Sequence, residues 1–165
     1  MSAKIKLIVV DDEIRFLRAL SQRLSLRDFD VSTATSGQEA IRLARTEEFD
    51  LALVDLKMPG MTGEEVLETL KREHPFIEVV ILTGHGTIES AVQCTQAGSY
   101  SYLQKPCETD ELLEVLKDAF GRRLHRKLKV NQEKLDRLAS IAMGESPLGI
   151  LKKLKALEDE GSGRE

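Results

Sequence analysis

Short apolar segments rich in β-branched residues alternate with longer amphipathic segments over the first 120 residues. Continuous apolar runs such as IKLIVV and VVILT are typical of strands that are buried on both faces. In the intervening segments apolar residues recur every three or four positions, the spacing of a helix that buries one face. The five predicted strands are Ile5–Val10, Asp30–Ala34, Leu51–Val54, Glu78–Leu82 and Ser99–Leu103.

The ends of the predicted helices carry residues that favour helix starts and stops. Ser36 and Thr62 are good N-caps, and each is followed three positions later by a glutamate. His74 precedes a proline and therefore disfavours helical angles, while Ala97-Gly98 is typical of a helix C-terminus. Strands that alternate with helices predict an α/β fold whose parallel sheet is covered on both faces.

Beyond residue 120 the apolar pattern changes to a heptad-like spacing. This spacing predicts that the fifth helix continues past Gly121 to about Met143 as a short coiled coil, which makes the chain a candidate homodimer. The pattern leaves open an amphipathic helix that folds back on the first 120 residues. The heptad positions are Leu124, Leu128, Asn131, Leu135, Leu138 and Ala142, and the first five of these are our dimerisation candidates.

A second, shorter helix is expected after the segment GESP. Ser146 is a favourable N-cap and Pro147 suits the first helical position. The helix would align Leu148, Leu151, Leu154 and Leu157, and residues 158–165 are expected to be frayed or disordered. The predicted segments are therefore a domain at 1–120, an extended helix at 121–143, and a short amphipathic helix with a tail at 144–165.

Composition and charge exclude several classes of protein. No apolar stretch approaches the roughly 20 residues that span a bilayer, so neither a membrane segment nor a signal peptide is expected. Cys94 and Cys107 have no metal-binding spacing, which favours reduced thiols in a cytoplasmic protein. The net charge of −4 is uneven, because residues 121–165 carry 11 basic and 7 acidic side chains. This basic tail lacks interleaved aromatics, so nucleic acid is not the expected partner.

Polar side chains stand at the carboxyl ends of the predicted strands. Asp11 and Asp12 follow the first strand, Asp55 the third, Thr83 the fourth, and Lys105 lies just after the fifth. Taken singly, these residues are typical of caps, turns and surface loops. The carboxyl ends of parallel strands share one edge, however, and α/β proteins bind ligands there.

These residue types suit the chemistry of a phosphoryl group. Clustered carboxylates repel one another, and Mg²⁺, which prefers oxygen ligands, relieves that repulsion. Asp55 could act as a nucleophile, with the Lys105 ammonium and the Thr83 hydroxyl binding phosphoryl oxygens. The neighbouring His85 is interpreted as a solvated loop histidine.

The sequence resembles the receiver domain of bacterial two-component response regulators. The matching segments are VVDDE at 9–13, LALVDLKMPGMTG at 51–63, VVILTGHG at 79–86 and YLQKP at 102–106. The resemblance covers residues 4–120. It implies a flavodoxin-like (βα)5 doubly wound sheet with strand order 2-1-3-4-5, and a sensor histidine kinase as partner.

The resemblance also implies a role for each residue of the site. Asp55 would be the phospho-acceptor, and Asp11, Asp12 and Asp55 would hold Mg²⁺ together with the backbone carbonyl of Lys57. The protein would then be no enzyme beyond its own Mg²⁺-dependent phosphorylation and slow dephosphorylation.

A switch is implied at the neighbouring strand ends. Thr83 would move toward the phosphoryl group and Tyr102 would change rotamer with it. Lys105 would pair with the phosphoryl group, and Pro106 would follow a cis peptide bond. The expected result is a changed protein-interaction or dimerisation surface.

The output of such a receiver stays open at the level of sequence. The TGHG loop and the GESP segment are similar to the corresponding segments of transcriptional activators that carry an AAA+ ATPase. The chain has no Walker A motif and too few tail residues for a helix-turn-helix domain. The alternatives are a piece of such an activator, a DNA-associated regulator that uses its basic tail, or a metal-dependent phosphatase that uses Asp55 transiently.

Overall fold

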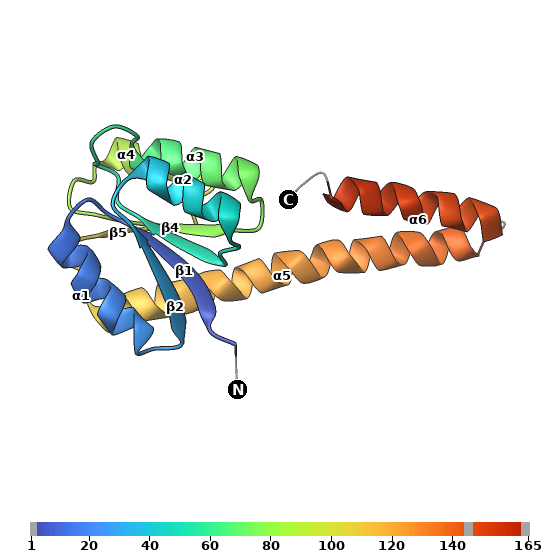
Figure 1. Ribbon diagram of the computed structural model, residues 1–165, viewed down its shortest axis with the longest axis horizontal. Helices are drawn as coiled ribbons and strands as arrows, with labels where there is room; N and C mark the ends of the chain where they lie inside the picture. Colours follow the sequence, from blue (N-terminus) through green and yellow to red (C-terminus); the bar gives the residue numbers. More distant parts are fainter. Residues whose placement is uncertain (1–2, 144–146, 163–165) are drawn as a thin grey trace.

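The computed structural model describes residues 3–143 and 147–162, and its core is a five-stranded parallel sheet (Figure 1). The strand order is β2-β1-β3-β4-β5, and every neighbouring pair is parallel. The strands are β1 Ile5–Val10, β2 Phe29–Ala34, β3 Leu51–Val54, β4 Glu78–Thr83 and β5 Ser101–Gln104. The predicted doubly wound α/β fold and its strand order are confirmed.

Helices cover both faces of the sheet and form two hydrophobic cores. The helices are α1 Ile14–Ser25, α2 Gly37–Thr46, α3 Gly63–Glu73, α4 Ile88–Gln96, α5 Thr109–Ala142 and α6 Pro147–Ser162. Helices α1 and α5 cover one face, while α2, α3 and α4 cover the other (Figure 1). In β1, Leu7 and Val9 belong to the first core and Ile8 and Val10 to the second, because successive side chains of a strand point to opposite faces.

The predicted helix ends are present, and the predicted strand ends differ from the observed ones by at most one residue except at the start of β5. The Ser36 and Thr62 side chains accept hydrogen bonds from the backbone N–H groups of the glutamates three residues later. Helix α3 ends at Glu73, directly before His74. The start that we predicted for β5 at Ser99 is two residues too early. The backbone N–H of Ser99 still bonds the carbonyl of Cys94 in the last turn of α4, which delays the strand to Ser101.

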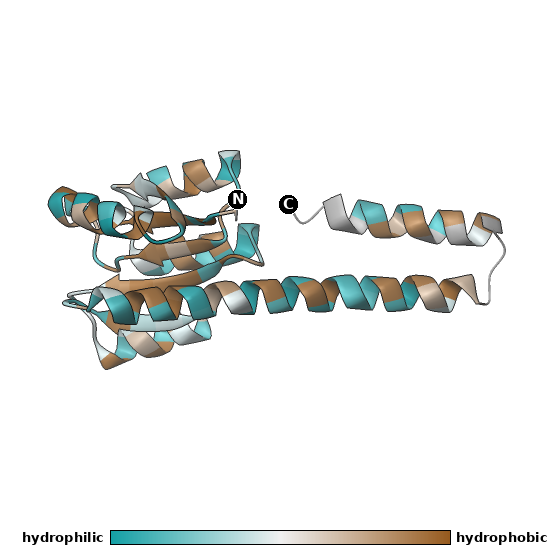
Figure 2. Ribbon diagram, turned by 90° about the horizontal axis from the view of Figure 1, so that it is seen from below, coloured by the Kyte–Doolittle hydropathy of each residue, from teal (hydrophilic) through white to brown (hydrophobic). Residues whose placement is uncertain are grey.

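Helix α5 continues without a break from Thr109 to Ala142 and projects far beyond the sheet (Figure 1). Helix α6 then runs back beside the outer part of α5, as both views show (Figures 1 and 2). The helix predicted at 121–143 therefore leads away from the receiver-like core, and it is α6 that folds back.

The expectation of a frayed end from Glu158 onward is wrong for residues 158–162, because α6 stays helical to Ser162. Leu154 and Leu157 are half-buried where α6 lies beside α5. This packing stabilises the last turns more than local propensity alone would. Ser146, our predicted N-cap, and residues 163–165 lie outside the described residues.

Two sequence expectations concern the described chain as a whole. Among the helices that the structure describes, none is both long and apolar enough to cross a membrane. Cys94 and Cys107 are both free thiols, and Cys94 is fully buried. Burial raises the pKa of the Cys94 thiol to about 11, so this group is protonated and inert at neutral pH.

Candidate functional site

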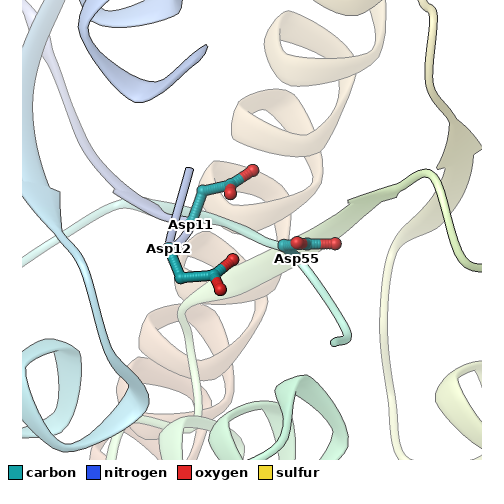
Figure 3. A group of neighbouring side chains, drawn as sticks. All are labelled: Asp11, Asp12 and Asp55. Atoms are coloured by element: carbon teal, nitrogen blue, oxygen red, sulfur yellow. The ribbon is translucent and has the colours of Figure 1, made fainter. Parts of the chain in front are cut away.

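Three carboxylates meet at the carboxyl edge of the sheet (Figure 3). Strands β1 and β3 are neighbours in register, Val10 opposite Val54, so the residues that follow them lie side by side. One oxygen from each of Asp11, Asp12 and Asp55 lies within 4.8 Å of the others. Asp11 and Asp55 are buried, whereas Asp12 is exposed and opens the cluster to solvent.

The Asp55 carboxylate is buried without full hydrogen bonding. Its Oδ1 atom has no hydrogen-bond partner among the residues that the structure describes. Burial raises the pKa of Asp55, and the nearby Thr83 hydroxyl and Lys105 ammonium oppose this rise. A buried carboxylate oxygen without a partner is costly, so the site favours a cation or a covalently attached group at this atom.

The side chains present fit a magnesium ion. Mg²⁺ takes oxygen ligands, keeps several waters, and is typically held by one or two carboxylates. The free Oδ1 of Asp55 and the neighbouring carboxylates of Asp11 and Asp12 supply such a donor set. Lys57, the proposed source of a carbonyl ligand, stands two residues after Asp55 in the loop, with its side chain in solvent.

Lys105 places the opposite charge at the cluster. Its Nζ atom lies 2.6 Å from Oδ2 of Asp11, 3.9 Å from Oδ2 of Asp55 and 4.0 Å from Oε1 of Glu13. Strand β5 lies next to β4, and the Lys105 backbone N–H bonds the carbonyl of Thr83. The peptide bond between Lys105 and Pro106 is cis, as the resemblance implied.

Phe16 is a member of the site that sequence reasoning missed. The Lys105 Nζ atom lies 4.0 Å from the centroid of the Phe16 ring, which is the geometry of a cation–π contact. The strand-end pattern did not include Phe16, because this residue lies within α1 and not at the end of a strand. Its position one turn after the aspartate pair was the available signal.

Thr83 and Tyr102 lie on neighbouring strands, but only Thr83 lies beside the carboxylates, whereas Tyr102 contacts α4. Thr83 ends β4, is fully buried, and accepts a hydrogen bond from the His85 backbone N–H at 3.1 Å. Tyr102 lies on β5, and its hydroxyl is 2.8 Å from Oγ of Ser90. Ser90 also closes the capping box of α4 with Thr87. Tyr102 is thus tied to the first turn of α4, a link that the sequence did not reveal.

The loop after Asp55 is closed by a glycine. The Gly63 backbone N–H donates to the carbonyl of Leu56 at 2.8 Å, where α3 begins against the end of β3. A side chain at Gly63 would collide with the Asp55 carbonyl and with Leu56. The stretch from Leu51 to Gly63 therefore presents Asp55 at a tight strand-to-helix connection.

The arrangement brings together the buried Asp55 carboxylate, two further carboxylates, an ammonium and a buried hydroxyl. It thus places together the residues predicted from the strand ends, Asp11, Asp12, Asp55, Thr83 and Lys105. Tyr102 faces α4 instead, and His85 is exposed. Chemically, the site can accept a phosphoryl group on Asp55 and balance its charge.

Comparison with known proteins identifies the family to which this fold belongs. The family model described as response regulator receiver domain matches residues 7–117. The chain is 39% identical over 113 residues to the transcriptional regulatory protein GlrR of Escherichia coli, covering 68% of this chain and 26% of GlrR. It is 33% identical over 143 residues to the alginate biosynthesis transcriptional regulatory protein AlgB of Pseudomonas aeruginosa, covering 86% of this chain and 32% of AlgB. The chain thus spans only about a third or less of these relatives.

Solved structures show the same fold. A response regulator receiver domain protein (CheY-like) from Methanospirillum hungatei matches with a TM-score of 0.72 and 29% identity, covering 74% of this chain and 98% of that one. A response regulator receiver domain protein from Clostridium thermocellum matches with a TM-score of 0.69 and 31% identity, covering 72% and 96%. The chain therefore belongs to the response regulator receiver family of two-component systems.

Proposed function

We propose that Asp55 accepts a phosphoryl group from a sensor histidine kinase. The observation that carries this proposal is the buried Asp55 carboxylate. Its Oδ1 atom has no hydrogen-bond partner among the described residues, its Oδ2 atom lies 3.9 Å from the Lys105 ammonium, and two further carboxylates lie beside it. Mg²⁺ would be held by Asp11, Asp12, Asp55 and the backbone carbonyl of Lys57. When bound, it supplies positive charge to a phosphoryl oxygen.

The transfer follows from the positions of the protein's own groups. A carboxylate oxygen of Asp55 attacks the phosphorus in line, and the bond from phosphorus to the kinase imidazole breaks with its electrons leaving on the nitrogen. The Lys105 ammonium binds one phosphoryl oxygen and the Thr83 hydroxyl donates to another. Water later hydrolyses the acyl phosphate in place, so the protein is a phosphoryl carrier and turns over no separate substrate.

The response to phosphorylation begins at Thr83. The added group brings about −1.5 to −2 charges and three acceptor oxygens, which draw the Thr83 hydroxyl toward Asp55. That movement frees space for Tyr102, which gives up its contact with Ser90 at the start of α4. The loop at Pro106 holds Lys105 in place. The face formed by α4, β5 and α5 is then the surface that changes.

A second copy of this chain is the proposed partner of the outer part of α5. Leu124, Leu128 and Leu135 are 46%, 67% and 60% exposed, and Asn131 between them is also exposed. Leu138 is half-buried. Hydrophobic positions recur along this part of the helix in Figure 2. Exposed leucines at heptad spacing suit a coiled-coil seam, in which a central asparagine specifies the register.

The proposed segments are a receiver at 1–120, the dimerisation helix at 121–143 and a tail at 144–165 that includes α6. GlrR and AlgB are named transcriptional regulatory proteins. For this chain we propose that any effect on transcription passes through protein contacts, in which the switched face or the seam takes part.

Labelled phosphate tests the acceptor. With acetyl phosphate or a sensor kinase as donor, wild-type protein and an Asp30→Asn control should both retain label in the presence of Mg²⁺. Asp30 is an exposed aspartate of β2. Asp55→Asn should retain none. Label on Asp55→Asn at the wild-type level would refute the assignment, and rapid turnover of a small phosphoester would favour the phosphatase alternative.

Light-scattering mass tests the output. The mass is measured with Mg²⁺, with and without beryllofluoride as the phosphoryl mimic, and Asp55→Asn serves as control. If the protein is a monomer that dimerises only with beryllofluoride, then the seam is part of the phosphorylation switch. A dimer under both conditions makes the seam constitutive and assigns the regulated output to the α4–β5–α5 face. A monomer under both conditions contradicts the proposed seam.

A further inference from the structure

Helix α5 contains a residue of low helix propensity, Gly121, near the place where the helix extends beyond the sheet. Gly121 lies in the interior of this helix, and a Cβ atom built there would meet nothing within 4 Å. Packing therefore does not require a glycine at this position. Glycine is the poorest helix former after proline, because it gains the most backbone freedom when the helix opens. Helix α5 is therefore least stable locally at Gly121, between the receiver and the dimerisation helix.

A buried arginine anchors the helix two residues later. Only 4% of the Arg123 side chain is exposed, although the residue lies on the part of α5 beyond Gly121. Its Nε atom is 3.0 Å from Oδ1 of Asp50, and its Nη2 atom is 2.9 Å from Oε1 of Glu48. Oδ2 of the same Asp50 accepts the backbone N–H of Lys6 in β1. Arg123 is thereby tied to the edge of the sheet.

A second arginine, one turn further along, holds a fully buried acid. The Nη1 atom of Arg126 lies 2.6 Å from Oε1 of Glu78, whose side chain is 0% exposed. Its Nη2 atom donates to the carbonyl of Pro75 at 2.7 Å. Arg122 adds a longer contact, 3.8 Å, to the same Glu78 oxygen. Within the described chain this is the buried ionic cluster that the phosphoryl site does not use.

The acids of this cluster stand at the opposite ends of the strands that carry the site. Asp50 directly precedes β3, which ends before Asp55. Glu78 begins β4, which ends at Thr83. We call the part of α5 beyond Gly121, residues 122–142, the arm. Strands β3 and β4 therefore carry the proposed phosphoryl site at their carboxyl ends and contact the arm at their amino ends.

We propose that Arg123 and Arg126 form an ionic latch that holds α5 straight across a hinge at Gly121. A slip or bend of the helix would leave Glu78 and Arg123 buried without partners, so the latch specifies one position of the arm. When the latch is open, the helix bends at Gly121. This inference rests on the proposed function only for the partner, a second copy of the chain on the seam.

The latch also sets the direction in which the seam faces. At 3.6 residues per turn, Leu124 and Leu128 lie roughly 150° around the helix from Arg123 and Arg126. Turning the arginines toward the sheet therefore turns the exposed leucines away from it. A latched arm presents the seam to a second copy in one orientation, and a hinged arm does not.

Hydrogen exchange of the full chain tests the latch. The latch-free variant carries Glu78→Gln, Arg123→Gln and Arg126→Gln. Glutamine at 78 avoids leaving a buried charge, and Asp50 and Glu48 are 24% and 76% exposed, so water can solvate them. A control carries Lys129→Gln and Arg137→Gln, two exposed cations of the same helix. All variants include Leu128→Asp, so that pairing of two seams does not protect the amides.

We expect amide protection at residues 122–130 to fall at least tenfold in the latch-free variant relative to the control. Protection in β3 and β4 should stay within threefold, which shows that the receiver is folded. Adding Gly121→Ala should restore at least half of the lost protection on a logarithmic scale. Unchanged protection at 122–130, or no recovery with Gly121→Ala, would overturn the proposal.

Two further measurements keep the test decisive. If β3 and β4 lose protection, the milder pair Glu78→Gln and Arg126→Gln replaces the triple change, with the same expected and contrary results. Labelling by acetyl phosphate is measured on the same samples. Because the latch lies at the far end of the sheet from Asp55, the latch-free variant should still be labelled at the wild-type level. Unchanged amide protection with normal labelling would contradict the latch alone, whereas absent labelling of the wild type would contradict the phospho-acceptor alone.

Discussion

At the scale of single residues, the Lys105 ammonium is held from two sides. Asp11 binds it directly at 2.6 Å, and the face of the Phe16 ring lies 4.0 Å away. A lysine side chain has four rotatable bonds and would otherwise sample many positions. Phe16 therefore positions the charge that meets a phosphoryl oxygen on Asp55, and does so without taking part in the chemistry.

Phe16→Leu should slow the phosphorylation of Asp55 by acetyl phosphate. A cation–π contact contributes about 0.5 to 2 kcal/mol, which corresponds to a roughly 2- to 30-fold slower rate. Phe16→Tyr keeps the ring and serves as the matched control, with a rate near that of the wild type. Equal rates for the leucine and tyrosine variants would show that the ring does not position Lys105.

Asp55→Asn should stabilise the fold at neutral pH when EDTA removes metal. Burial raises the pKa of Asp55, so its ionised form is disfavoured in the folded state. The free-energy cost of ionising the buried Asp55 is absent at pH values below the unfolded pKa of about 3.9. It grows as the pH rises from there through the folded pKa, and it is constant above the folded pKa. We expect a Tm increase at pH 7 that vanishes near pH 3. A Tm increase of equal size at both pH values would contradict this origin.

At the scale of elements, local sequence decides where the helices begin. Ser36 and Thr62 each cap a helix through a side-chain oxygen, and both were recognisable from spacing alone. The opening of α4 is different, because Ser90 shares its hydroxyl with Tyr102 of β5. The start of α4 therefore depends on a neighbouring strand, which suits an element that is proposed to move.

Ser36→Ala should destabilise the receiver by about 0.5 to 2 kcal/mol, because the Glu39 backbone N–H loses its acceptor. Ser36→Asp keeps an acceptor and should retain most of the stability. Urea unfolding, followed by circular dichroism, measures both variants. An alanine variant as stable as the wild type would mean that water replaces the cap.

At the scale of the whole molecule, the arm and the sheet are joined by ion pairs that span much of the sequence. Arg123 meets Asp50, and Arg126 meets Glu78. Helix α6 lies beside the outer part of α5, along which Val130, Leu138 and Ile141 are half-buried, while Leu124, Leu128 and Leu135 stay exposed. The fold-back of α6 thus leaves Leu124, Leu128 and Leu135 of the proposed seam open to a second copy, whereas Leu138 is half-buried.

Leu128→Asp should prevent dimerisation under every condition in which the wild type forms a dimer. A charge at the centre of the seam has no partner and is costly to bury. Leu26→Asp is the matched control, because Leu26 is 85% exposed and lies at the end of α1. Light-scattering mass measures both variants, and a dimer of Leu128→Asp would place the interface elsewhere.

The α/β class, the strands and most helix ends were predictable from sequence because they depend on local periodicity and capping. The gathering of Asp11, Asp55, Thr83 and Lys105 was also predictable, since parallel strands bring their carboxyl ends to one edge. The shifted start of β5 at Ser101 was not predictable, because it depends on a bond between Ser99 and the last turn of α4.

The sequence by itself therefore determined the strands, most helix boundaries and which polar groups stand at the strand ends. Only the tertiary structure decided that Phe16 faces Lys105, that Ser90 binds Tyr102, and that the arm is anchored at Asp50 and Glu78. The physical reason is that periodicity reports which face of an element is apolar. It carries no information on which distant side chain meets that face, because this choice depends on packing the whole chain at once.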